Sequence, residues 1–213
     1  MYLQGMGVPA TSRPRRSRRQ CTVYHTSLAQ RGLPSCGVKA MVHLHAWPMR
    51  GTRIGEAAQP GPPRPVRILA ANTTRWTASW QGLLAAEPDL ILAQEARLEP
   101  DGLEDARRAA TRRGWQLEPG EMDGGTALLA AAVKAGQMAA RPIPLPDLAP
   151  EFAGRLQLLA VHGGAGRTLL LLNVYGRPGG PRDLPFNTQL LLEGLAAVRS
   201  HGRLPAAIIL GPV

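Results

Sequence analysis

Three segments of the chain place polar side chains directly after apolar runs, where strands are expected to end. Asn72 follows RILAA, Gln94 and Glu95 follow LILA, and Asn173 and Tyr175 follow LLLL. A carboxylate oxygen is a ligand that Mg²⁺ prefers, and an amide and a phenol can donate hydrogen bonds to a phosphate. If these strands share a sheet and their ends converge, Glu95 would bind a metal ion, and Asn72 and Tyr175 would contact a phosphate. Taken singly, such residues more often face solvent or form turns.

The apolar pattern from Val66 onward predicts the elements that would position these residues. Strands are expected over 66–72, 90–95, 115–120, 124–133, 155–163, 167–176 and 205–210, and helices over 75–87, 100–114 and 185–202. The segment 141–154 is rich in proline and predicts a loop. The runs LILA, LLLLNV and AAIIL are apolar at consecutive positions, which is typical of strands covered on both faces. The pattern predicts an α/β domain over residues 66–213.

The N-terminal part of the chain differs in charge and composition. Residues 1–67 hold eleven Lys or Arg residues and one acidic residue, and therefore carry the whole formal net charge of +10. Residues 1–65 lack a sustained hydrophobic period and end in QPGPPRP, so they predict a disordered basic leader rich in proline and arginine. An arginine cluster in this leader is a candidate for weak nucleic-acid contact or a localisation signal: Arg13, Arg15, Arg16, Arg18 and Arg19.

The cysteine and hydropathy patterns give fewer indications. Cys21 and Cys36 precede His43 and His45, but this spacing matches no familiar zinc site. Two cysteines without a disulfide framework favour an intracellular compartment, with nuclear and organellar locations both open. No apolar run is long enough for a transmembrane helix, so no membrane partner is expected.

Five motifs occur in an order and spacing that resemble the endonuclease/exonuclease/phosphatase family: RILAANTTRW, EPDLILAQEARL, GGTALLA, GRLQLLAVHGGAGRTLLLLNVYG and LPAAIILG. The family includes abasic-site endonucleases, pancreatic deoxyribonuclease and retrotransposon endonucleases, which are Mg²⁺-dependent hydrolases of phosphate esters. By this resemblance, Glu95 corresponds to the metal-binding glutamate and Asn72 to an asparagine that usually follows a tryptophan, here Ala71. Tyr175 corresponds to a tyrosine that contacts the scissile phosphate, and Arg155 to a structural arginine. The implied fold is the first half of a four-layer α/β sandwich, a mixed sheet with helices on one face.

The end of the sequence departs from the family pattern. The family continues its last matched strand with a GDFN-like segment and later an Asp-His pair, whereas this chain reads GPV, with Pro212 in place of the aspartate. His162 and His201 do not match the family histidine. The sequence therefore predicts a truncated, catalytically incompetent copy whose sheet exposes one apolar face. Two alternatives stay open: a non-catalytic nucleic-acid-associated module that binds through its arginine-rich leader, and an enzyme completed by another chain.

Overall fold

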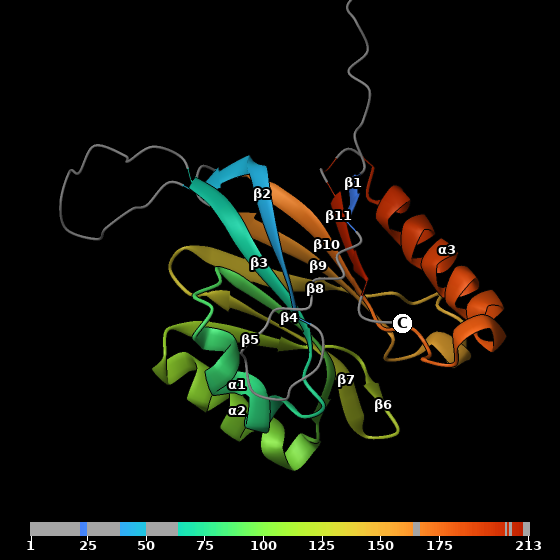
Figure 1. Cartoon of the computed structure of the whole chain (residues 1–213), viewed down its shortest axis with the longest axis horizontal. Coiled ribbons are helices and arrows are strands. Elements are labelled where there is room, and N and C mark those ends of the chain that lie inside the picture. Colours follow the sequence, from blue (N-terminus) through green and yellow to red (C-terminus); the bar gives the residue numbers. More distant parts are fainter. Residues whose placement is uncertain are drawn as a thin grey trace, which may run out of the picture.

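The computed structural model describes residues 22–24, 39–49, 64–163, 167–202, 204 and 206–210 (Figure 1). Two mixed β-sheets lie face to face in it. Sheet 1 has the strand order β2-β3-β4-β7-β5, with a short β6 paired to β7, and sheet 2 has the order β1-β11-β10-β9-β8. The strands of sheet 1 are β2 (Lys39–Met49), β3 (Arg64–Asn72), β4 (Leu90–Leu98), β5 (Trp115–Pro119), β6 (Met122–Asp123) and β7 (Thr126–Lys134). Those of sheet 2 are β1 (Thr22–Tyr24), β8 (Met138–Ile143), β9 (Leu156–Gly163), β10 (Thr168–Val174) and β11 (Ala206–Leu210).

The inner faces of the two sheets form one buried core. Ile68, Leu92 and Val133 of sheet 1 belong to the same cluster as Leu159 and Leu171 of sheet 2, and all five are fully buried. The expectation that one sheet face stays uncovered is therefore wrong. The chain itself supplies the cover, because β8 to β11 form a second sheet that packs on the first.

Helices cover the outer face of each sheet (Figure 1). On sheet 1 lie α1 (Trp76–Leu84) and α2 (Pro100–Arg112), with Trp76, Trp80 and Trp115 in the buried cluster beneath them. On sheet 2 lies α3 (Leu184–Ser200), whose Leu190 and Val198 belong to the outer cluster of that sheet. The layer order is helix, sheet, sheet, helix. The predicted α/β class, with a mixed sheet that carries helices on one face, is confirmed. None of the helices in the described ranges is long and apolar enough to cross a membrane.

Two strands lie within the segment predicted to be a disordered leader. β2 pairs antiparallel with β3, and β1 pairs parallel with β11. The predicted boundary at residue 65 therefore differs from the structure over 22–24 and 39–49, where the backbone gains ladder hydrogen bonds by extending an existing sheet. The predicted proline-rich loop also differs, since 138–143 pair with β9 as β8 before a short 3₁₀ helix at Pro150–Phe152.

Candidate functional site

Glu95 lies in an irregular part of β4. The strand pairs in regular register with β3 up to Gln94, and its pairing with β7 shifts between Gln94 and Leu98. Within this interruption Glu95 has a φ of 53° and Arg97 a φ of 46°, in the left-handed region that non-glycine residues rarely adopt. A bulge of this kind turns side chains out of the regular alternation of the strand. Here it lets Glu95 reach a side chain of sheet 2, as the buried Gln94 does, although regular alternation would place these two neighbours on opposite faces of β4.

Asn72 ends β3, the neighbour of β4, and its side chain contacts Glu95. The Asn72 Nδ2 group donates to Glu95 Oε1 at 2.7 Å, and its Oδ1 accepts from the Thr74 amide at 3.1 Å. Because Oδ1 accepts from a backbone amide two residues on, the side chain is held in an Asx turn. The next residue, Thr73, fixes this turn to β4, since its amide and its hydroxyl both donate to the Gln94 carbonyl, at 2.8 and 3.0 Å.

Tyr175 comes from sheet 2, one residue beyond the end of β10. Its hydroxyl donates to the same Glu95 Oε1 at 2.6 Å. Arg155 secures the backbone here: its carbonyl accepts from the Tyr175 amide at 3.0 Å, and its Nη1 lies 3.4 and 3.3 Å from the carbonyls of Tyr175 and Gly176. The Arg155 guanidinium also lies 5.4 Å from the centre of the Tyr175 ring. These contacts agree with a structural role for Arg155.

The three predicted residues therefore meet, but not along the edge of one sheet. Asn72 and Glu95 belong to sheet 1 and Tyr175 follows a strand of sheet 2. The cluster therefore joins the two sheets at the end of β3, the irregular part of β4 and the end of β10. The condition that all three strands share one sheet is not met, since only β3 and β4 do. The convergence arises because β4 and β10 face each other across the core.

A buried network of amides beneath the cluster was missed by the sequence analysis. The Gln94 Nε2 group donates to Asn173 Oδ1 at 2.8 Å across the two sheets. Asn173 Nδ2 lies 3.3 Å from Gln157 Oε1, and Gln157 Nε2 donates to the Glu118 carbonyl at 3.0 Å. Gln94 and Asn173 are completely buried, and Gln94 Oε1 has no hydrogen-bond partner among the described residues. The available signal was an amide at the end of each of two apolar runs, LILAQ and LLLLN.

The hydrogen bonds set the protonation states of the cluster. The hydrogen bond from Tyr175 lowers the pKa of Glu95 most; the bond from Asn72 and the charge of Arg97 act in the same direction, against the effect of burial. Burial, followed by the hydrogen bond to the Glu95 carboxylate, raises the pKa of Tyr175 to about 12. At neutral pH the carboxylate is therefore ionised and the phenol keeps its proton. The cluster combines one anion with two hydrogen-bond donors.

Glu95 is the one residue of the cluster that could bind a metal ion. Its Oε1 accepts both hydrogen bonds, while Oε2 lies 4.0 Å from Arg97 Nη2, and the side chain keeps 21% of its surface exposed. Within the described ranges no three or more His, Cys, Asp or Glu residues form a group that could hold a metal. A Mg²⁺ ion at Glu95 would accordingly take its other ligands from water and from phosphate oxygens, as this ion commonly does.

The two histidines lie elsewhere. His162 Nδ1 is 2.9 Å from the Thr168 hydroxyl in the β9–β10 hairpin, and His201 Nδ1 is 2.9 Å from the Ala197 carbonyl at the end of α3. Neither contacts the cluster, in agreement with the sequence analysis. Several other candidates lie outside the described residues: the leader arginines 13, 15, 16, 18 and 19, both cysteines, the tip of the GGAG turn, and Pro212.

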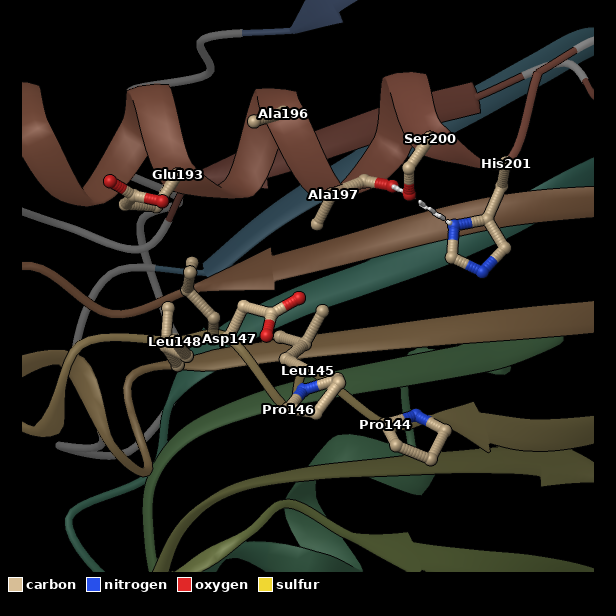
Figure 2. Close-up of a pocket in the computed structure, with 11 residues that line it drawn as sticks. Pro144, Leu145, Pro146, Asp147, Leu148, Glu193, Ala196, Ala197, Ser200 and His201 are labelled. Atoms are coloured by element: carbon tan, nitrogen blue, oxygen red, sulfur yellow. Dashed lines mark hydrogen bonds between the residues drawn. The ribbon is translucent and has the colours of Figure 1, made fainter.

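A cavity of about 480 Å³ lies away from the cluster, between α3 and the segment 144–148. Its walls include the apolar Leu145 and Leu148, with Glu193 from α3 and His201 just beyond the end of the helix (Figure 2). None of Asn72, Glu95 and Tyr175 lines this cavity. The candidate site is thus separate from this cavity.

No family model and no curated protein matches the sequence. Among solved structures, the chain is similar to a humanized D. rerio TDP2, with 18% identity, a TM-score of 0.45, and coverage of 68% of this chain and 60% of that one. It is similar to the human Nocturnin catalytic domain, with 15% identity, a TM-score of 0.47, and coverage of 81% and 66%. An endonuclease/exonuclease/phosphatase family protein from Bacteroides thetaiotaomicron gives 15% identity, a TM-score of 0.46, and coverage of 64% and 54%. The chain thus spans less than two thirds of the length of most of these neighbours, and each likeness is partial.

Proposed function

We propose that this chain binds the phosphate group of a phosphate ester through a divalent cation at Glu95, as a phosphoester-hydrolase-like site. One observation carries the proposal: Glu95 Oε1 accepts hydrogen bonds from both Asn72 and Tyr175, residues that come from opposite sheets. Two donors on one oxygen fix the plane of the carboxylate and favour its ionised form. The resemblance of the QE and NVY motifs to the endonuclease/exonuclease/phosphatase family supports the same assignment.

Each residue has a distinct part in binding. Glu95 holds the cation with its ionised carboxylate, and a bound Mg²⁺ would neutralise charge on the phosphoryl oxygens. Tyr175 stays protonated throughout the neutral range, because its pKa is about 12. Its single O–H donates to Glu95 in the free chain and can turn from the carboxylate to a phosphate oxygen when the ligand binds. Asn72, held by the Asx turn, keeps its Nδ2 donor at the same place when the ligand arrives.

We further propose that this chain binds phosphate esters without efficient turnover. By the motif resemblance, Pro212 occupies the position of an aspartate that acts on the attacking water, and a prolyl side chain neither binds a metal nor accepts a proton. A positioned acid or base contributes about 10²- to 10⁴-fold to a rate. Metal and phosphate binding should accordingly be measurable where hydrolysis is slow. Non-catalytic association with nucleic acid is the second candidate, favoured by the net charge of +10 carried by residues 1–67.

Binding and turnover can be measured separately on the full chain. Mn²⁺ binding is followed by water-proton relaxation with and without inorganic phosphate, and hydrolysis is followed with p-nitrophenyl phosphate and its bis-ester. Glu95→Gln should weaken Mn²⁺ binding at least tenfold and abolish its enhancement by phosphate. Glu99→Gln is the matched control, because Glu99 is exposed just beyond β4 and makes no side-chain cap to α2. Unchanged Mn²⁺ binding in Glu95→Gln would refute the site.

Hydrolysis distinguishes the remaining possibilities. Rapid metal-dependent turnover that Glu95→Gln abolishes would retain the site and overturn the proposed slow chemistry. Turnover that appears only after a second protein is added would favour an enzyme completed by another chain. Binding of nucleic acid that is independent of both the cation and Glu95 would favour the second candidate.

A further inference from the structure

We propose that Arg177, two residues beyond Tyr175, forms a second anion position, which takes another phosphate of the same strand when one phosphate of a single-stranded nucleic acid is bound at Glu95. The inference rests on the proposed function and names its substrate class: an oligonucleotide in preference to a mononucleotide. Three observations support it: the hydrogen bonds of the Arg177 backbone, the position of its guanidinium group, and the N–H donors of that group that have no acceptor among the described residues.

The Arg177 backbone is fixed to the start of α3. Its amide donates to Asn187 Oδ1 at 2.8 Å, and Asn187 Nδ2 donates to its carbonyl at 3.0 Å. A side-chain amide that satisfies both polar groups of one residue acts like a short piece of sheet pairing. The position of Arg177 relative to the helix is therefore set before any ligand binds.

The guanidinium stacks on an aromatic ring of the same helix. Arg177 Cζ lies 3.7 Å from the centre of the Phe186 ring, and Phe186 in turn packs against the buried Phe152, with 5.1 Å between ring centres. A guanidinium stacked on an aromatic face keeps the N–H groups along its edge available for bidentate contact with a phosphate. Stacking also reduces the rotamer entropy that the arginine loses on binding.

The Arg177 side chain makes no ion pair or hydrogen bond with any residue in the described ranges. Arg155, its neighbour in this region, differs in this respect because its Nη1 is directed to the carbonyls of Tyr175 and Gly176. Arg155 lies between the two aromatic rings, 5.4 Å from Tyr175 and 5.7 Å from Phe186. The row of Tyr175, Arg155, Phe186 and Arg177 thus leads from the Glu95 cluster to an oriented cation without an acceptor.

A nucleic-acid strand fits this arrangement because it carries one phosphate charge at every nucleotide. A phosphate bound at Glu95 and Tyr175 has further phosphates attached along the strand, and Arg177 provides donors for one of them. A mononucleotide offers a single phosphate group and gains nothing from Arg177. The expected difference between variants is therefore in the salt dependence of oligonucleotide binding, since each phosphate neutralised on a single strand contributes about 0.7 to the slope of log K against log salt.

The test uses the full chain, a fluorescent oligothymidylate and thymidine 5′-monophosphate, at a constant concentration of divalent cation. Arg177→Gln should lower the salt slope for the oligonucleotide by about 0.7 and leave the affinity for the mononucleotide within twofold of wild type. Arg177→Lys should keep the slope, because it keeps the charge, while losing affinity through the lost stacking. Arg199→Gln is the matched control, since it removes an exposed arginine from the last turn of α3.

Three results would overturn the inference. The salt slope could stay unchanged in Arg177→Gln, it could fall equally in Arg199→Gln, or both ligands could weaken equally, which would place Arg177 on the first phosphate. Equal midpoints of urea unfolding for the arginine variants show that the comparison concerns folded proteins. If Arg177→Gln fails to show the expected change while Glu95→Gln loses Mn²⁺ binding as expected, only the second phosphate position is rejected. If neither variant shows its expected change, the proposed function is rejected as well.

Discussion

The amide network between the sheets should be a measurable source of stability, and Asn173→Leu is the sharpest way to test it. Leucine has nearly the shape of asparagine and suits a position with no exposed surface. The substitution removes the acceptor of the 2.8 Å bond from Gln94 Nε2, and also the weaker contacts of 3.3 and 3.4 Å to Gln157 Oε1 and the Ala93 carbonyl. Gln94 would then keep no side-chain hydrogen bond to a described residue, because its Oε1 already has none.

The cost follows from leaving buried polar groups without partners. An orphaned buried amide costs about 1–3 kcal/mol, and the two longer contacts add less than a full bond each, so we expect a loss of about 2–4 kcal/mol. Gln94→Met together with Asn173→Leu removes both partners of the shortest bond and should cost less than the sum of the single variants. The difference, a coupling of about 1–3 kcal/mol, isolates the interaction across the sheets.

Urea unfolding followed by tryptophan fluorescence measures these costs, because Trp76, Trp80 and Trp115 all lie in the core beneath α1 and α2. Gln189→Met is the control, since this amide is exposed on α3 and its loss should change stability by less than about 0.5 kcal/mol. The denaturant slope must be the same in all variants for the comparison to hold. The reasoning would be refuted if Asn173→Leu lowered the free energy of unfolding no more than Gln189→Met does. It would also be refuted if the loss in the double variant equalled the sum of the losses in the two single variants.

Three further perturbations test other parts of the structure. Tyr175→Phe should raise the pKa of Glu95 toward that of an ordinary glutamate, as seen by NMR titration of the carboxyl carbon. Because the pKa of Glu95 is lowered in the folded state, its ionised carboxylate stabilises the fold above the unfolded pKa, and this stabilisation is lost as pH falls through the folded pKa. The difference in unfolding free energy between wild type and Tyr175→Phe should therefore become smaller in acid. A difference that does not change with pH would contradict this prediction. Asp89→Asn should lower the free energy of unfolding in urea by about 2–3 kcal/mol. Asp89 is completely buried, accepts from the Arg67 amide at 2.8 Å, and lies beside the partly exposed side chains of Arg67 and Lys134. A loss below about 0.5 kcal/mol would contradict this prediction. Gly194→Val should lower the free energy of unfolding by about 1–3 kcal/mol, because a Cβ at this position would lie 2.6 Å from Leu172 Cδ2 in the core under α3. Thermal or urea unfolding measures this loss. Unchanged stability would mean that the core rearranges without cost.

The sequence predicted most elements of the domain because their hydrophobic periods are strong. The consecutive apolar runs at 90–93 and 169–172 indicated strands buried on both faces, and β4 and β10 are such strands. The arrangement of these strands in two sheets was less accessible. An apolar run shows that both faces of a strand are covered, but it does not show whether helices or another sheet cover them.

The strand β2 illustrates a different failure. Its sequence KAMVHLHAWPM lies among basic and proline-rich segments. The composition of residues 1–65 as a whole therefore predicted disorder, although this short stretch is apolar enough to form a strand. In the structure it gains its backbone hydrogen bonds from β3, the next strand, which begins only after the segment 50–63. A local pattern cannot report a partner of this kind, so edge strands are harder to predict than central ones.

The candidate site was partly predictable for a similar reason. Residue types after strand ends indicated Asn72, Glu95 and Tyr175, whose side chains do meet. The bulge that aims Glu95, and the buried amides that join the sheets, depend on register and cross-sheet packing. No spacing in the sequence encodes either of these.

The backbone of β4 is strained at this cluster. Glu95 and Arg97 both adopt left-handed φ values, and such conformations cost about 1–3 kcal/mol each for residues other than glycine. Glycine at either position would adopt the same backbone without this steric cost. The surrounding contacts instead maintain the strained conformation, since Gln94 is held across the sheets and Glu95 by two donors. This strain accords with the proposed cation site at Glu95, because stability alone would favour a regular strand.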